Sequence, residues 1–178
     1  TTQLLLTIAA SGSLFLASCG GSHDHPHEGE ATEEVAVETT EAAIDAAAST
    51  VNWTGEMMGM YSHNGAVAVK EANVSMSGDK LAGGNFTVDL SGITPTDVNY
   101  TEEEGHTAAD LVGHLSSPDF FDVANHPTAS FVITEVAEDG ASAKGNLTVR
   151  GITNEETVEN ITVADGTLSG TLTFDRTK

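Results

Sequence analysis

The residues of this chain that could carry acid–base chemistry are four histidines in its central and C-terminal part: His63, His106, His114 and His126. Enzymes use imidazole most often as a general base, and 27 Asp and Glu residues are present to orient it. No G-x-S-x-G, H-E-x-x-H, C-x-x-C or phosphate-binding loop accompanies them. We therefore interpret His114 as a structural residue beside a helix end and His63 and His126 as turn residues. We predict no catalytic residue, no metal site, no cofactor and no enzymatic activity.

A second group of histidines lies near the N-terminus, in the run His23-Asp24-His25-Pro26-His27-Glu28. Alternating imidazoles and carboxylates can chelate Zn²⁺ or Cu²⁺. The run belongs to residues 20–49, which are rich in Gly, Ser, Glu, Thr and Ala and poor in large apolar side chains. Such a composition buries too little surface to offset the loss of chain entropy. We interpret residues 20–49 as a disordered tether and its histidines as solvated linker residues.

Cys19 is the only cysteine, so it cannot form an internal disulfide. It follows an apolar run from Leu4 to Ala17, which is too short for a membrane span and typical of the core of a secretory signal. Leu16-Ala17-Ser18-Cys19 resembles a bacterial lipobox, whose cysteine receives a diacylglyceryl group. We expect residues 1–19 to be a lipoprotein signal peptide, clipped at its start. Cys19 would then anchor the protein to a membrane of the bacterial envelope, facing the periplasm or the cell surface.

The charge balance is strongly acidic, with six Lys and Arg residues and a formal net charge of −21. A surface of this kind repels phosphate backbones and anionic headgroups, which excludes nucleic acid as a partner. By the same argument, a ligand with an uncharged headgroup suits this surface better than an anionic one. Residues 50–178 are enough for one domain with a single core.

From residue 51 onward apolar and polar residues alternate with a period of two, as in Phe86, Val88 and Leu90 against Thr87 and Asp89. Further strands are expected near 127–137, 141–151, 156–164 and 167–175. The pattern predicts an all-β antiparallel sandwich or barrel. Residues 107–115 are the exception, because their apolar residues stand at helical separations and predict one short helix.

The run from His114 to Val123, continued by His126-Pro127-Thr128-Ala129-Ser130-Phe131, is similar to the HLxSxDFFDVxxxPTxxF signature of the YceI-like family. Val51–Gly55, Ser62–Gly65, Gly145–Thr153 and Asp175–Thr177 resemble, in the family's order, its first strand, the following turn, its G-D-L-T-x-x-G-x-T hairpin and its D-R-T. The resemblance covers residues 51–178. It implies an antiparallel lipocalin-like β-barrel of about eight strands over residues 50–178. The family pattern continues past Lys178, so we expect a gap between the first and last strands.

The resemblance also implies that the barrel binds a long apolar lipid, because an eight-stranded barrel can enclose one slender ligand. A tunnel requires small inward residues, and the candidates are Ala66, Ala68, Gly83, Gly84, Ala129 and Ala143. A filled core is built from the same apolar residues as the lining of a ligand tunnel, so the sequence pattern does not separate the two. The predicted lining is Trp53, Met58, Met60, Phe86, Val88, Leu90, Phe120, Phe131, Ile133, Leu147, Val149, Leu172 and Phe174.

We therefore expect the chain to bind, carry or store an isoprenoid or quinone-like lipid without catalysis. One alternative is a structural or stress-associated envelope protein with a filled barrel and protein partners. The other is a small hydrolase or isomerase acting on an apolar substrate, which requires two of the histidines and carboxylates to converge at the mouth of a cavity. Nothing in the sequence indicates an oligomeric state.

Overall fold

The computed structural model describes residues 2–10, 38–57, 61–98, 100, 101, 103 and 105–178. These residues form nine strands and one helix. In chain order they are β1 (Thr2–Ala10), β2 (Thr40–Ala42), β3 (Ile44–Met57), β4 (Tyr61–Ser77), β5 (Lys80–Pro95), α1 (Ala108–Ser116), β6 (Thr128–Val136), β7 (Ala143–Val149), β8 (Ile152–Ala164) and β9 (Thr167–Phe174).

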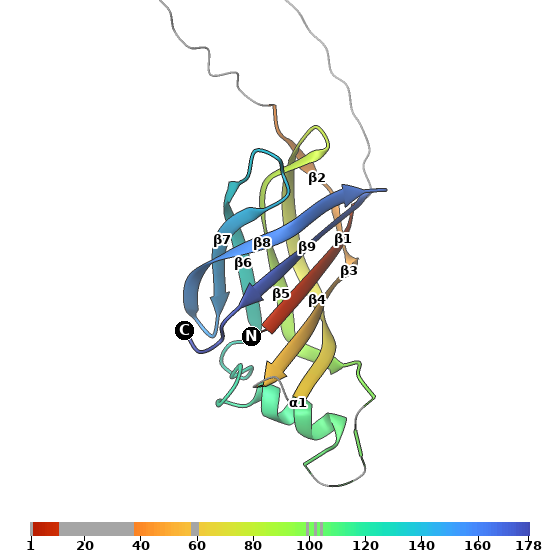
Figure 1. The fold of residues 1–178 in the computed structure, drawn as a ribbon, viewed down its shortest axis with the longest axis vertical. Helices are drawn as coiled ribbons and strands as arrows, with labels where there is room; N and C mark the ends of the chain where they lie inside the picture. The colour runs from red at the N-terminus through yellow and green to blue at the C-terminus, as the bar shows by residue number, and fades with distance from the viewer. Residues whose placement is uncertain (1, 11–37, 58–60, 99, 102, 104) are drawn as a thin grey trace, which may run out of the picture.

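The strands form one antiparallel sheet in the order β2-β4-β3-β1-β9-β8-β7-β6-β5. Because β4 also pairs with β5, the sheet closes on itself (Figure 1). β2 pairs with the end of β4 and β3 with its beginning, so these two strands together form one side of the ring. The structure confirms the predicted all-β antiparallel barrel. Closure satisfies the backbone donors and acceptors that an open sheet leaves unpaired at its edges.

The expected gap between the first and last strands is absent, because β1 lies between β3 and β9 and pairs with both. Its residues Thr2 and Leu4 oppose Gly55 and Trp53 on one side. Residues 2–10 fall within the predicted signal peptide, and here they supply a strand of the barrel. An extended apolar segment fills such a gap because it satisfies two open rows of backbone hydrogen bonds. Cys19, the lipobox and the His23–Glu28 run lie outside the described residues.

Strand structure begins earlier than the predicted tether boundary at residue 49, because β2 and β3 start at Thr40 and Ile44. Ala42, Ile44 and Ala46 are partly buried and pack against the core, whereas the residues between them are exposed. This alternation is built mainly from alanine, so composition alone concealed it. The prediction of a turn at Ser62–Gly65 is also wrong, since these residues lie in β4. His63 is therefore a strand residue.

Helix α1 confirms the predicted helix to within one residue at each end, and it lies at one end of the barrel (Figure 1). Thr107 caps its N-terminus. The Thr107 side chain accepts a hydrogen bond from the Asp110 backbone N–H, and the Asp110 carboxylate accepts one from the Thr107 backbone N–H, both at 3.1 Å. This reciprocal capping box satisfies two donors that a helix start otherwise leaves free. Leu115 anchors the helix in the core.

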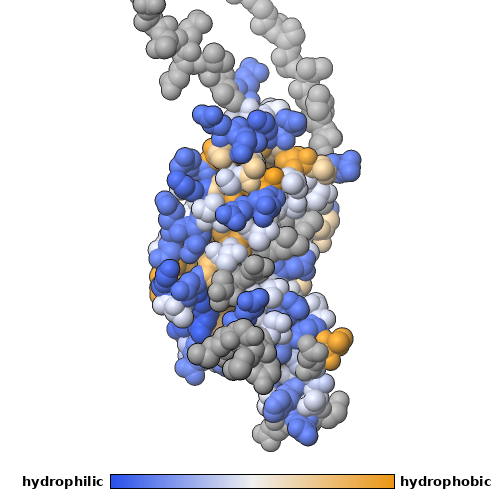
Figure 2. All heavy atoms as spheres, viewed as in Figure 1, coloured by the Kyte–Doolittle hydropathy of each residue, from blue (hydrophilic) through white to orange (hydrophobic). Residues whose placement is uncertain are grey.

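Inside the barrel, large side chains occupy the space that inward-facing glycines leave open. A Cβ atom at Gly65 would overlap the Trp53 ring, and one at Gly145 would overlap the Phe131 ring. Gly170 makes the same kind of room for Val158. Phe131 is fully buried. These glycines therefore admit the side chains of neighbouring strands instead of leaving a tunnel. Hydrophilic residues cover most of the face shown in Figure 2, in keeping with the acidic composition.

Candidate functional site

Most residues of the predicted lining face the interior of the barrel. Seven have an exposed fraction of 8% or less: Trp53, Phe86, Val88, Leu90, Phe131, Leu147 and Leu172. Four are partly buried and pack against this core: Phe120, Ile133, Val149 and Phe174. Met58 and Met60 lie outside the described residues. The Trp53 indole N–H is buried and has no hydrogen-bond partner among the residues that the structure describes.

The predicted small inward residues divide into two groups. Ala66 and Ala68 do not face inward, because the buried residues of this part of β4 are Val67 and Val69, and Ala68 is exposed. Ala66 and Ala68 are apolar, and so are Val67 and Val69, so the sequence pattern did not show which of the two pairs faces inward. Ala129 and Ala143 do lie on the inner face, in phase with Phe131 and Leu147.

The predicted glycines of β5, Gly83 and Gly84, lie against β4. Gly84 has a φ of +144° and its Cα faces the β4 backbone closely enough that a Cβ atom would meet Val74 Cα at 3.0 Å. Its role is a close strand approach, for which glycine is the suitable residue. Neither glycine lines one of the two cavities described next.

One cavity, the inner cavity, has a volume of about 30 Å³ and lies at the end of the barrel away from α1. Its walls are largely apolar and include Phe86, Phe131, Ile133 and Ala143. The Phe86 and Phe131 rings stack there with centroids 5.5 Å apart. One water molecule needs about 10–15 Å³ of such space, so the inner cavity has room for only a few small groups and not for a long lipid chain.

A second cavity, the mouth pocket, has a volume of about 70 Å³ and opens at the α1 end. Ile152, Asn154 and Glu156 of β8 lie on the inner face here, because they oppose Val149, Leu147 and Gly145 in the ladder. Ile152 is 57% exposed, so solvent reaches the inner face at this point. The pocket is lined by Phe120, Phe121, Leu147, Val149, Arg150, Ile152, Asn154, Glu156, Phe174, Asp175, Arg176 and Lys178.

Aromatic contacts shape the rim of the mouth pocket. Phe120 and Phe121 pack edge to face with centroids 4.7 Å apart, and both line the pocket. The His114 ring packs edge to face on Phe120 at 5.5 Å, in agreement with its interpretation as a structural residue beside the helix end. The His126 ring lies beside Gly151, at the turn between β7 and β8.

Two arginines reach the same rim from the two strands that flank β8. Arg150, after β7, donates from Nη1 to the carbonyl of Phe120 at 2.9 Å. Arg176, after β9, donates from Nη1 to the carbonyl of Asp119 at 3.5 Å, and its guanidinium lies 4.0 Å from the centroid of the Phe120 ring. Sequence reasoning did not select either residue for the site. The only signal was their presence in the hairpin and D-R-T segments of the resemblance.

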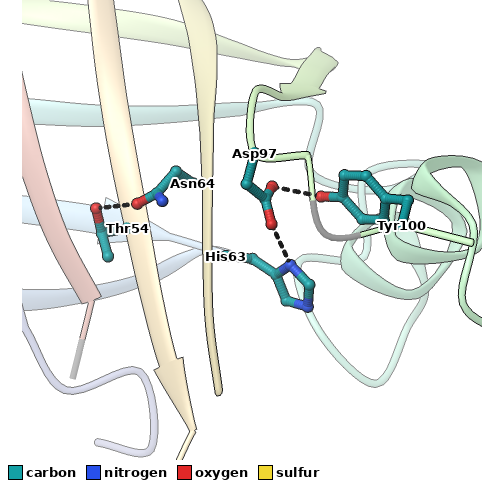
Figure 3. Close-up of polar contacts among 5 residues, drawn as sticks. All are labelled: Thr54, His63, Asn64, Asp97 and Tyr100. Carbon is teal, nitrogen blue, oxygen red and sulfur yellow. Dashed lines mark hydrogen bonds and ion pairs between the residues drawn. The ribbon is translucent and has the colours of Figure 1, made fainter.

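His63, Asp97 and Tyr100 form a separate polar cluster at the α1 end of the barrel (Figure 3), and His63 is in phase with the inward-facing Gly65 and Val67 of β4. Asp97 lies between the two rings: His63 Nδ1 is 2.8 Å from one carboxylate oxygen, and the Tyr100 hydroxyl donates to the other at 2.5 Å. Burial alone would raise the pKa of Asp97, but hydrogen bonds from Tyr100 and His63 lower it below the usual range. Burial and the Asp97 carboxylate raise the pKa of the Tyr100 phenol well above its usual value.

This cluster is the convergence of a histidine and a carboxylate that an enzyme would need, but neither residue lines the inner cavity or the mouth pocket. Its contacts join the segment after β5 to the start of β4. The Thr96 backbone N–H adds a hydrogen bond to the Asn64 carbonyl at 2.8 Å, and the Thr54 hydroxyl donates to the Asn64 side chain at 2.8 Å. The cluster therefore positions the segment that leads into α1. Within the described part of the chain, no three metal-ligating side chains group together.

No helix in the part of the chain that the structure describes is long and apolar enough to cross a membrane. Comparison with known proteins shows that a YceI-like domain model matches residues 43–178. A UPF0312 protein of Pseudomonas aeruginosa strain LESB58 is 36% identical over 90 residues, covering 47% of this chain and 46% of the relative.

Protein YceI of Escherichia coli O6:H1 is 34% identical over 90 residues, with the same two shares. A UPF0312 protein of Pectobacterium carotovorum is 35% identical over 92 residues, covering 51% of this chain and 40% of the relative. The chain spans about half the length of the curated relatives it matches, or less. The family match covers most of the barrel and the mouth pocket, and the chain belongs to the YceI-like family.

Proposed function

We propose that this chain binds an apolar lipid, an isoprenoid or a similar long-chain molecule, inside its barrel and catalyses no reaction on it. The observation that carries the proposal is a closed barrel with an apolar interior that opens to solvent at the mouth pocket. Among the described residues, Ser49 is the only polar residue that is buried, and its hydroxyl donates to the backbone carbonyl of Asp45. The described interior is therefore apolar apart from this one satisfied hydroxyl.

The energetics of such binding come from the ligand chain. Each CH₂ group moved from water into an apolar site contributes about 0.8 kcal/mol, so one isoprene unit of five carbons contributes roughly 3–4 kcal/mol. A few units suffice for tight binding without any polar contact. The Trp53 indole N–H supplies one donor that a ligand oxygen could accept, because a buried donor without a partner costs about 1–3 kcal/mol.

A long chain exceeds the volumes of the inner cavity and the mouth pocket, so binding requires inner side chains to shift. The aromatic side chains are the candidates, because Phe131 lies between the two cavities: it lines the inner cavity and opposes Leu147 of the mouth pocket in the ladder. Trp53 is the only tryptophan of the chain and is 8% exposed. Its fluorescence therefore reports such a shift directly.

We place this function in the bacterial envelope. The support is the apolar run before Cys19 and the lipobox-like sequence around it, together with the bacterial relatives. Cleavage before Cys19 would remove β1 and open the sheet between β3 and β9, but not the mouth pocket. Metabolic labelling with a palmitate analogue in a bacterial host tests the anchor. We expect the label on the full chain and its loss in Cys19→Ala. Label that persists in Cys19→Ala would refute the assignment of Cys19 as the lipidated residue.

Native mass spectrometry with organic extraction tests the lipid site. We expect a co-purifying apolar species of defined mass, reduced in Ala129→Leu and Ala143→Leu, whose side chains lie on the inner face. The matched control is Ala68→Leu on the exposed face, which should leave the species in place. A cooperative denaturation transition in each variant shows that loss of lipid is not loss of fold. An empty protein that takes up no added polyprenol or quinone would refute the proposal.

The small cavities favour a second candidate function, a structural envelope protein whose barrel is filled. The supporting observation is that Trp53 and Phe131 occupy the space above Gly65 and Gly145. For a filled barrel we expect no change in Trp53 emission on addition of any lipid, and cross-linking in the envelope should identify protein partners. A lipid-dependent emission change that Ala129→Leu abolishes would exclude this candidate.

A further inference from the structure

We propose that the mouth pocket is an anion subsite, in which Arg150 and Arg176 bind the carboxylate or phosphate headgroup of a single-chain amphiphile whose tail enters the barrel. Entry of the tail into the barrel rests on the proposed function, whereas binding of the anionic headgroup by the two arginines does not. The proposal replaces the expectation of an uncharged headgroup, which was based on net charge alone. Local charge at the mouth differs in sign from the charge of the chain as a whole.

The distribution of cations supports this assignment. The chain has two arginines and four lysines against 27 carboxylates, and both arginines line the mouth pocket together with Lys178. The other cations, Lys70, Lys80 and Lys144, line neither cavity. Guanidinium presents a planar set of donors that matches a carboxylate or phosphate, so arginine is the residue suited to such a group.

The arginines are also positioned before any ligand binds. The carbonyls of two successive residues, Asp119 and Phe120, each accept one N–H from a different arginine. A guanidinium has five N–H donors, so most remain for a ligand. Within the described residues, neither arginine lies within 4.0 Å of a carboxylate oxygen. Two oriented guanidinium groups at one rim, neither paired with a carboxylate of the described residues, form a site for an anion.

Two carboxylates also line the pocket and limit its affinity. Asp175 accepts hydrogen bonds from the Thr177 backbone N–H at 3.0 Å and hydroxyl at 2.7 Å, contacts that lower its pKa and hold it in the turn after β9. Glu156 lies on the inner face of β8. We infer that Glu156 opposes an anionic headgroup, so Glu156→Gln should strengthen anion binding.

The rest of the pocket suits the first part of an alkyl tail. Phe120, Phe121 and Phe174 surround the entrance, and Leu147 below them is buried. Leu147 opposes Phe131 in the β6–β7 ladder, and Phe131 forms a wall of the inner cavity. These residues lead from the charged rim to the apolar interior, and the pocket's volume of about 70 Å³ suits the start of one alkyl tail rather than two.

The test compares three probes of equal chain length, dodecanoate, dodecyl phosphate and dodecanol, by Trp53 fluorescence and calorimetry at low salt. We expect both anions to bind about tenfold more tightly than dodecanol. That preference should disappear in Arg150→Gln/Arg176→Gln, while dodecanol affinity stays unchanged and shows that the fold and tail site remain intact. Lys80→Gln/Lys144→Gln, with the same change in net charge, is the control and should keep the preference. The ratio between the two anions identifies the preferred headgroup.

Equal affinity of the wild-type protein for all three probes, or an anion preference that survives Arg150→Gln/Arg176→Gln, would overturn the subsite. Failure of every probe to bind would overturn the proposed lipid function instead. In that case butyl phosphate, titrated while amide chemical shifts are followed, tests the headgroup site alone. Shifts around Arg150 and Arg176 that the double variant lacks would support the subsite, and their absence would refute it.

Discussion

Gly65→Ala tests the central feature of the interior, the packing of the Trp53 ring over a glycine. The added Cβ atom would overlap the Trp53 ring and the carbonyl oxygen of Thr94. Neither can withdraw freely, because the ring is 8% exposed and the carbonyl belongs to the backbone of β5, which pairs with β4 at this position. Overpacking of a core costs about 1–3 kcal/mol, and two obstacles place this change at about 3 kcal/mol. For a chain of this size that is a fall in Tm of roughly 6–12 °C.

Urea denaturation followed by tryptophan fluorescence measures both the free energy of unfolding and the environment of Trp53, the only tryptophan. We also expect the native emission of Gly65→Ala to shift to longer wavelength as the ring is displaced. The matched control is Gly92→Ala, on β5, where a Cβ atom would meet nothing within 4 Å. An unchanged midpoint and emission in Gly65→Ala would show that Trp53 does not pack on Gly65, and the account of a filled interior would be wrong.

Three further predictions concern other parts of the fold. Phe131→Ala should lower the free energy of unfolding, measured by urea denaturation, by about 3–5 kcal/mol, because Phe131 is fully buried. Val132→Ala is the control and should cost far less, because the Val132 side chain is 48% exposed. Equal losses in the two variants would contradict the assignment of Phe131 to the inner face. Asp97→Asn should destabilise the protein more at pH 7 than at pH 3. A carboxylate whose pKa is lowered on folding stabilises fully above its unfolded pKa of about 3.9, and this stabilisation is lost as the pH falls through the lower folded pKa. Denaturation midpoints measured at both pH values check this, and a pH-independent difference would contradict it. Thr107→Ala should lower the free energy of unfolding by about 1 kcal/mol, because the helix cap is lost. Thr101→Ala is the control. If hydrogen exchange shows no loss of protection at the start of α1 in Thr107→Ala, the cap does not contribute as described.

The mouth pocket and the inner cavity together suggest how a lipid would enter. The rim is polar and partly open, and the interior beyond Leu147 is apolar and closely packed. A headgroup bound at the rim would hold the tail at the entrance while side chains inside rearrange. The fluorescence of Trp53 and the affinity ratio of the charged and neutral probes therefore separate the two steps, insertion of the tail and binding of the headgroup.

The strand pattern and the helix were predictable because they depend on neighbours in sequence. Phe86, Val88 and Leu90 alternate with polar residues, and all three are buried on β5. The helix was predictable from the helical spacing of Leu111, Val112 and Leu115, which is a local feature. The run from His114 to Phe131 supplied the family, which the comparison confirmed.

Where two adjacent positions are both apolar, as at Ala66 and Val67, periodicity does not show which one faces inward, and only packing against the next strand resolves it. The same holds for residues 2–10, whose composition is equally typical of a signal peptide and of a strand, and whose place depends on the open edges of β3 and β9.

The polar sites depend on contacts between residues far apart in the chain. His63 meets Asp97 across 34 positions, and Arg176 meets the carbonyl of Asp119 across 57. Local sequence patterns therefore established the strands, the helix and the family of this protein. The direction of each side chain and the gathering of its arginines at one rim arise from the tertiary fold, because pairing of β9, β8, β7 and β6 side by side brings the ends of β7 and β9 to the loop between α1 and β6.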